Sequence, residues 1–591
     1  MTRIVVVGVG RFTDRNYEFP KALSPVEMCA EACRRAERDT GRDGILKDVV
    51  AIGTIPSFCE MRFPVKPLHS NFPKSVACKI GAAERVKYCV HAFPGGNGPQ
   101  LMVNEFAEMI AKNEINGVAL ITGCEILKTF DNAMRRRESK EYMIKKWVDQ
   151  THKDRPKRTN ARPRRTRRDI ENVVNMYAKC PNPVRQFVNI RFNNQPLEHT
   201  HTHTQVHSYA MFENAYRARH GLSTEESNRQ IGRMYSEFTE IASKSPDHSW
   251  YPTVRTSHEI SNISDSNFIV SGPYTKNMCA IERVNQSAAI LIMSETEAKR
   301  RDIPRDRWIY LHGCGDAEDV EVITLRKHLD RSEAMRSAYC EAFRSAKLDM
   351  VRDRHRFACR DLYSCFPIAV NAARRILGIS ESVSASELTV TGGLAFHGGP
   401  GNNYVSHSIC AVVERLRLLG STNRRFGLVG ANGGFLTEHS VGIYSPDRPR
   451  HEFSRKDPSI YNPKPYGLSS KHCFTSEPED GIGRILAWTV VHDTRKKFRN
   501  QSRHGIVIGE MITGRDRSKR FMGITNSKDT STVNWLLHNK INPVGSNVRV
   551  RVDRKNPLSL GQFKDIPNVI IEKLGDDDNN ELVEAASSSR L

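Results

Sequence analysis

The sequence predicts a layered α/β core, built as two similar halves, followed by a small all-β domain. The first observation is that predicted strands and helices alternate along the first part of the chain of 591 residues. The second is that the same ingredients return after about residue 288, which favours an internal duplication. The third is a change after about residue 465 to short alternating strands, which is typical of a β-barrel or sandwich. Alternation of this kind indicates stacked layers of helices and sheet.

The first half starts with a β-branched run that predicts a buried strand of the parallel type. Ser24-Pro25-Val26-Glu27 is a capping box with proline at the first helical position, so a helix follows it. The predicted elements are a strand at Arg3–Gly10, a helix from Ser24 to Ala36, a strand at Val49–Gly53, a helix at Gln100–Lys112 and a strand at Gly117–Thr122.

The second half is expected to begin with the apolar run Ala288–Met293. Its further predicted elements are strands at Trp308–His312, Phe426–Val429 and Ser440–Tyr444, and helices at Glu333–Ala346 and Ile368–Leu377. The β domain is predicted from the runs Ile485–Val491, Gly505–Glu510, Arg520–Ile524 and Val548–Val552. We therefore place domains at 1–255, 256–460 and 465–560, with a basic insertion near 135–200 and a polar tail at 561–591.

A glycine-rich stretch, residues 391–403, precedes a helical run from Tyr404 to Leu419. Five glycines fall between Gly392 and Gly401, where the backbone must turn through positive φ or pass close to another group. Such a turn at the start of a helix can present N–H groups to an anion. A strand-to-helix connection without any ligand is the alternative.

Net charge is +22, and nine of the sixteen residues 153–168 are Lys or Arg. A charge block of this kind predicts a solvated segment that could touch acidic partners. We do not expect nucleic-acid binding from it, since no aromatic residue lies within it. A basic surface also suits a polyphosphate ligand such as coenzyme A.

Histidines alternate at His199, His201 and His203, with His207 nearby, and on a strand they could share a face and bind a transition metal. We expect an exposed loop there and no metal site. Fourteen cysteines without a spacing pattern indicate reduced, buried thiols and no zinc motif. No apolar run reaches membrane-spanning length.

The chain ends in Ser589-Arg590-Leu591, a conservative variant of the Ser-Lys-Leu tripeptide that the peroxisomal import receptor reads. The polar tail before it favours a signal over a chance match. The expected location is a peroxisome or a related organelle such as a glycosome, and otherwise the cytoplasm.

Several motifs, in this order, resemble the thiolase superfamily. Pro94-Gly-Gly-Asn-Gly-Pro-Gln100 with Leu120-Ile-Thr-Gly-Cys-Glu125 is similar to the loop, helix and strand that carry the thiolase nucleophile. Asp361-Leu-Tyr-Ser-Cys-Phe366 is similar to the oxyanion segment, the glycine-rich stretch to the catalytic-histidine segment, and Phe426–Gly434 to the second-cysteine loop. Sterol-carrier-type thiolase-like proteins of type 1, which have an extra C-terminal domain, resemble the chain most. The resemblance implies a duplicated five-layered αβαβα core that binds acyl-CoA.

The matched positions depart from the thiolase pattern. Asn97 stands where the resemblance places the nucleophilic cysteine, and Gly399 where it places the catalytic histidine. Tyr363 falls at the oxyanion residue and Ala431 or Gly430 at the second cysteine. An amide cannot replace an activated thiolate, so the usual thiolase mechanism is not expected.

Substitutes can be proposed from the same segments. Cys365 and His397 are the candidate catalytic residues, although each could instead be a packed or locally bonded side chain. Hydrogen-bonding or close-approach roles toward a thioester are predicted for a second group. Its members are Asn97, Gly392, Gly393, Gly398, Asn402, Asn403 and Asn432.

The leading hypothesis is a thiolase-like acyltransferase of lipid metabolism with an altered active site. A non-catalytic acyl-CoA or lipid carrier is the alternative, and a nucleic-acid or protein-interaction role ranks third. Acyl-CoA and the peroxisomal import receptor are the expected partners, with no cofactor beyond a coenzyme A thioester. The sequence leaves open a monomer or a homodimer.

Overall fold

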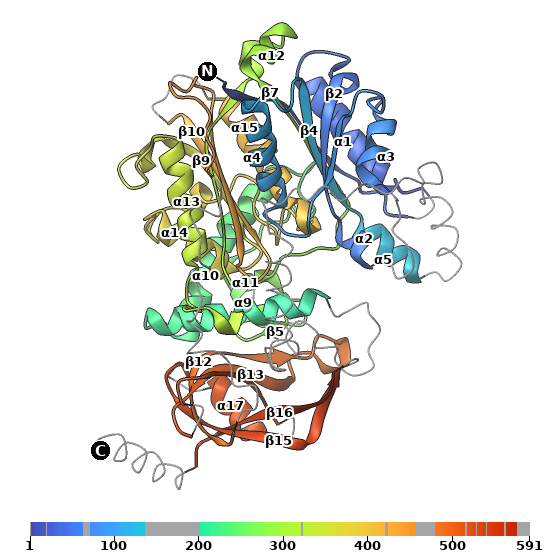
Figure 1. Cartoon of the computed structure of the whole chain (residues 1–591). Helices are drawn as coiled ribbons and strands as arrows, with labels where there is room; N and C mark the ends of the chain where they lie inside the picture. The colour runs from blue at the N-terminus through green and yellow to red at the C-terminus, as the bar shows by residue number, and fades with distance from the viewer. Residues whose placement is uncertain are drawn as a thin grey trace.

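The computed structural model describes residues 2–18, 21–62, 71–135, 201–320, 323–419, 424–456, 479–514, 517–526, 529–538, 541–560 and 563–575. The basic block 153–168 and the C-terminal tripeptide lie outside these ranges. Figure 1 shows a large α/β core and, below it, a smaller β domain, so the predicted fold class is confirmed.

Nine strands form one sheet through the core, in the order β3-β2-β4-β7-β1-β8-β11-β10-β9. The first half supplies β1 (Ile4–Thr13), β2 (Val49–Ile55), β3 (Tyr88–His91), β4 (Val118–Glu125) and β7 (Gln286–Ser294). The second supplies β8 (Ile309–Glu318), β9 (Phe357–Leu362), β10 (Phe426–Gly433) and β11 (Glu438–Ser445). In each half the first strand pairs with the last one, so the two halves repeat one topology and meet where β1 pairs with β8.

Helices divide the core into layers. Helices α1 (Pro25–Asp39) and α3 (Phe72–Lys79) cover the first half, and α13 (Glu333–Ser345) covers the second with α14 (Pro367–Ile376) beside it. Two helices, α4 (Gly98–Ala111) and α15 (Tyr404–Arg417), contact strands of both halves. Nearly every side chain of α15 is buried, as expected for a helix enclosed on all sides.

Two details of the predicted core need correction. β1 is buried as predicted, but both of its neighbours run antiparallel to it. A continuous apolar run indicates that both faces of a strand are buried, but it does not determine whether the neighbouring strands run parallel or antiparallel to it. The strand near Ala288 is β7, which lies between β4 and β1, so the second half begins at β8.

Three helices cross the lower edge of the core: α9 (His201–Arg219), α10 (Thr224–Ser243) and α11 (Ser257–Ser261). Below α9 lie β12 (Gly481–His492), β13 (Ser502–Met511), β14 (Arg520–Thr525), β15 (Asn547–Leu560), β16 (Phe563–Lys573) and α17 (Thr530–His538) (Figure 1). The short strands β5 (Ile269–Ser271) and β6 (Tyr274–Thr275) extend this second sheet from the core side. Helix α17 and strand β16 were not predicted.

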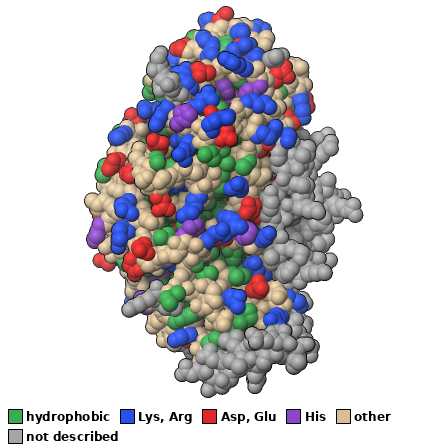
Figure 2. Space-filling view, turned by 90° about the vertical axis from the view of Figure 1, so that its left-hand side faces the viewer, with side chains coloured by type: hydrophobic (Ala, Val, Ile, Leu, Met, Phe, Trp, Pro, Cys, Tyr) green, Lys and Arg blue, Asp and Glu red, His purple; other side chains and the backbone are tan. Residues whose placement is uncertain are grey.

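The remaining short helices are α2 (Phe58–Arg62), α5 (Leu127–Arg135) and α12 (Glu295–Arg300). Figure 2 shows Lys and Arg side chains spread over one face of both domains, with Asp and Glu side chains among them. Among the described helices, none has the length and apolar character needed to cross a bilayer.

Candidate functional site

Three of the segments singled out in the sequence, 94–100, 361–366 and 426–434, meet at the start of α4. Asn97 is the residue before this helix; it is buried, and its Nδ2 lies 3.4 Å from Ser440 Oγ on β11. Gly96 is pressed against the other segments: a Cβ there would come within 2.2 Å of the Tyr363 hydroxyl and 2.5 Å of the Asn432 carbonyl. Glycine at position 96 therefore permits the close approach of the loop to the ends of β9 and β10.

Cys365 lies in this region beside Asn432 and Tyr209. Asn432 Nδ2 lies 3.7 Å from the Cys365 sulfur and donates to the Tyr209 hydroxyl at 2.8 Å. That hydroxyl also accepts from the Leu436 N–H at 2.9 Å and donates to the Gly434 carbonyl at 3.2 Å. Tyr209 thus fixes the loop after β10, a role that sequence reasoning missed because α9 follows the predicted insertion.

Burial raises the pKa of the Cys365 thiol to about 12, and the nearby Tyr209 hydroxyl and Asn432 amide lower it by less. Burial likewise raises the pKa of the Tyr209 and Tyr363 hydroxyls. The thiol is therefore protonated at neutral pH. A nucleophilic cysteine needs a depressed pKa or an adjacent base.

The glycine-rich turn is held by one buried carboxylate, Asp361, at the end of β9. Its Oδ2 accepts hydrogen bonds from the backbone N–H groups of Val390 and Thr391, at 3.0 and 3.1 Å, and from the hydroxyls of Thr389 and Thr391. Its Oδ1 accepts from two hydroxyls of α15, those of Tyr404 and Ser408, at 3.0 and 2.7 Å. Asp361 thereby joins strand, turn and helix.

Two glycines of the turn pack closely against other described residues of the chain. A Cβ at Gly392 would lie 2.6 Å from Ala242 on α10, and one at Gly398 would lie 2.5 Å from Gln286 Oε1. Gly392, Gly393 and Gly398 all have positive φ. Glycine is therefore required here by the backbone conformation and by packing, whatever the turn binds.

The amides after the turn donate hydrogen bonds to the backbone. Asn402 Nδ2 donates to the Pro56 carbonyl at 2.9 Å, and Asn403 Nδ2 donates to the Gly123 carbonyl at 2.7 Å. Both residues therefore tie the start of α15 to the first half of the core.

His397 is fully buried, and neither ring nitrogen has a hydrogen-bond partner among the described residues. The same holds for His407, whose ring centroid lies 5.1 Å from that of His397. Desolvation, reinforced by the charge of Arg11 and by His248, lowers the pKa of His397 well below its usual value. The two rings are neutral, and His407 is a second histidine that sequence reasoning did not single out.

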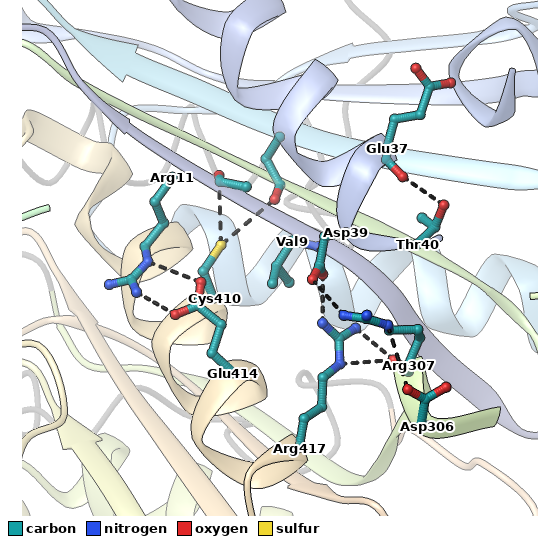
Figure 3. A network of polar contacts seen from close by, with 12 residues as sticks. Val9, Arg11, Glu37, Asp39, Thr40, Asp306, Arg307, Cys410, Glu414 and Arg417 are labelled. Carbon is teal, nitrogen blue, oxygen red and sulfur yellow. Dashed lines mark hydrogen bonds and ion pairs between the residues drawn. The ribbon is translucent and has the colours of Figure 1, made fainter. Parts of the chain in front are cut away.

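Arg11, on β1, belongs to a polar network that fastens α15 to the first half (Figure 3). Its guanidinium pairs with Glu414 of α15, and Cys410 points toward backbone carbonyls of β1 and β7. One turn further, Arg417 donates to Asp39 at 2.5 Å and to the Arg307 carbonyl. These contacts hold rigid the helix that follows the glycine-rich turn.

The two candidate catalytic residues have different neighbours. Cys365 contacts Tyr209 and Asn432, whereas His397 contacts His407 and the ring of Tyr404. The described contacts therefore do not include a thiol–imidazole pair between Cys365 and His397.

The alternating histidines were predicted to form an exposed loop, and from His201 onward this prediction is wrong: α9 begins there. His207 is buried and its Nδ1 lies 2.9 Å from Ser271 Oγ. Within the described ranges, no three His, Cys, Asp or Glu side chains are arranged to hold a metal ion.

One hollow in the described structure lies beside Asn97 and another beside the β domain. A cavity of about 20 Å³ beside Asn97 is lined on its polar side by Glu105, Glu318 and Glu438. A larger cleft, of about 900 Å³, separates α10 and α11 from the β domain. Neither Cys365 nor His397 lines the larger cleft.

The chain shares its fold with solved structures. A crystal structure of a monomeric SCP2-thiolase like protein type 1 from Mycobacterium smegmatis is 27% identical to the chain; the match covers 96% of this chain and 98% of that one, with a TM-score of 0.69. An Ltp2-ChsH2(DUF35) aldolase shares the fold at 16% identity and a TM-score of 0.51, over 76% of this chain and 99% of that one.

No family model and no curated protein sequence matches the chain. The structural match is nevertheless nearly full length, and the converging segments are those on which the resemblance was based. The chain has the fold of the thiolase superfamily, and over 96% of its length it is similar to an SCP2-thiolase like protein of type 1.

Proposed function

We propose that this protein binds acyl-CoA in fatty-acyl metabolism and does not form an acyl-enzyme on a cysteine. The observation that carries the proposal is the chemistry at the start of α4: an amide, Asn97, takes the place of the thiol there. The nearest candidate thiol, Cys365, is buried and protonated, with burial raising its pKa to about 12. Thioester binding, or acyl transfer without a covalent intermediate, remains compatible with these residues.

The amide groups at the start of α4 support a thioester ligand. Asn432 Nδ2 is directed at the Cys365 sulfur and the Tyr209 hydroxyl, and a second amide, Asn97, lies on the facing loop. An amide donor of this type stabilises a carbonyl oxygen in a site that excludes water. Both N–H groups of Asn432 already have partners, whereas Asn97 Nδ2 has one described partner and a second N–H for this role. The net charge of +22 favours a polyphosphate such as coenzyme A.

Titration calorimetry of the full chain with acetyl-CoA tests binding, and intact mass spectrometry of the same mixture tests acylation. We expect saturable binding without an added acetyl group. Absence of heat and of thermal stabilisation at millimolar acetyl-CoA would contradict the proposal. An acetyl group mapped to Cys365 would replace it with an acyltransferase that uses this thiol.

Asn97→Cys sharpens the test. A thiol at the start of α4 would gain thiolate character from the helix N-terminus. We expect this variant to accumulate an acetyl group at position 97, while Asn97→Ala, its control, does not. Failure of Asn97→Cys to react while still binding acetyl-CoA would place the thioester away from α4.

We further propose import into peroxisomes or glycosomes through Ser589-Arg590-Leu591. A fluorescent protein that carries this tail should be punctate in cells, and removal of Leu591 should make it diffuse. A cytosolic signal from both fusions would reject the address.

A further inference from the structure

The C-terminal strands close into a five-stranded barrel. β12 pairs with β13, β13 with β14, β14 with β16, β16 with β15, and β15 with β12. The β14–β16 pair is parallel and the other four are antiparallel, and α17 lies between β14 and β15 in the chain. This connectivity is that of an OB-fold, a barrel whose loop between its first two strands commonly contacts ligands.

In this barrel the corresponding loop, residues 493–501, is basic and contains an aromatic ring. Lys496 and Lys497 are exposed, and neither forms an ion pair within the described ranges. Phe498 is half-buried, with the Arg495 guanidinium 4.8 Å and the Lys497 ammonium 5.5 Å from its ring centre. The carboxylate of this loop, Asp493, is bound to Arg495.

The basic surface continues onto the core. Arg499 lies 4.6 Å over the ring of Phe268, and Lys276 approaches the same ring from 6.0 Å. Burial and the charges of Arg255 and Arg499 lower the pKa of Lys276, so three cations lie close together here. Arg499 donates to the backbone carbonyl of Asp265 and forms no ion pair with a carboxylate in the described part of the chain.

The surface around the barrel loop combines cations with aromatic rings, and in this it differs from the basic block at 153–168. The block at 153–168 has no aromatic residue, and charge alone does not distinguish a nucleic acid from other polyanions. Here two phenylalanines and at least four cations form one surface, named the loop patch: Lys276, Lys496, Lys497, Phe268, Phe498 and Arg499. Single strands bind such surfaces through phosphate–cation contacts and base–aromatic stacking.

We propose that the loop patch of the OB-barrel binds single-stranded nucleic acid. The phosphates would contact Lys496, Lys497 and Arg499, and bases would stack on Phe498 and Phe268. This activity is independent of acyl-CoA binding at the start of α4, because the patch is built from the barrel loop and from residues after α11.

Fluorescence anisotropy of the full chain with a labelled 12-nucleotide single strand of RNA tests the proposal. Lys496→Gln/Lys497→Gln should weaken binding at least tenfold. It should also reduce the slope of log affinity against log salt concentration by about 1.4, because each phosphate contact on a single strand contributes about 0.7 to that slope. Phe498→Leu should weaken binding roughly tenfold without changing the salt slope, since stacking does not depend on charge.

The matched control is Lys299→Gln/Arg300→Gln on α12, which removes two exposed charges at the opposite end of the molecule (Figure 1). It should leave affinity within about twofold. Equal loss from both double variants, or no binding of the RNA at low salt, would overturn the proposal. So would equal affinity for inorganic polyphosphate with no effect of Phe498→Leu, which would indicate a general polyanion site.

Discussion

Asp361→Asn tests whether one carboxylate organises the glycine-rich turn. The carboxylate accepts six hydrogen bonds, four at Oδ2 and two at Oδ1. The new amide group must direct its NH₂ at one of these two sets. The hydroxyls of Tyr404 and Ser408 can rotate to accept, whereas the N–H groups of Val390 and Thr391 cannot. The amide is therefore expected to face α15 with its NH₂ group.

The magnitude follows from the charge that is lost. A hydrogen bond to a charged group contributes roughly 1.5–3 kcal/mol, about twice a neutral one. If only the two Oδ1 contacts lose their charge-assisted character, each loses about half of this value, and Asp361→Asn should cost about 1.5–3 kcal/mol of unfolding free energy. At about 2 °C per kcal/mol for a large domain, this corresponds to a drop of roughly 3–6 °C in Tm.

Differential scanning calorimetry checks the value, with Asp447→Asn as control. Asp447 is about half exposed and pairs with Arg425 at 2.9 Å, so its change should cost roughly 0–1 kcal/mol. The affinity for acetyl-CoA should also fall in Asp361→Asn if the turn shapes the ligand site. A Tm within 1 °C of the wild type would refute the view that Asp361 holds strand, turn and helix together.

Three further predictions concern single groups. Cys365 should resist iodoacetamide at pH 8 in the native protein while the exposed Cys340 reacts, as peptide mapping would show; rapid alkylation of Cys365 would contradict its burial. Burial raises the pKa of Glu213 to about 7, so its contribution to stability is full below about pH 4.5 and is lost as pH rises toward 7. Urea titrations at pH 5 and 7 should show that loss, at most about 1.4 kcal/mol per pH unit, diminished in Glu213→Gln, and an unchanged pH dependence would reject it. Gly398→Ala should lower Tm by several degrees more than Gly44→Ala, because both have positive φ but only Gly398 faces a Cβ contact of 2.5 Å; equal effects would leave backbone strain as the whole cause.

The sequence alone determined the elements whose signals are local. The capping box at Ser24 and the periodicity of residues 100–112 predicted α1 and α4 within a few residues, because caps and apolar spacing act within one or two turns. The order of the motifs predicted the thiolase fold. It also showed that Asn97 stands where a thiolase has its nucleophilic cysteine, because both inferences depend only on which residues follow one another in the sequence.

Only the tertiary structure decided which side chains meet. Tyr209 became part of the site because α9 brings it beside Asn432 and Cys365, over distances in sequence that no local pattern spans. The reversed direction of β1 and the parallel β14–β16 pair follow from which strands become neighbours. Pairing of β12 with β5 likewise placed Arg499 of the barrel loop over Phe268, because long-range strand pairing, and not periodicity, fixes that contact.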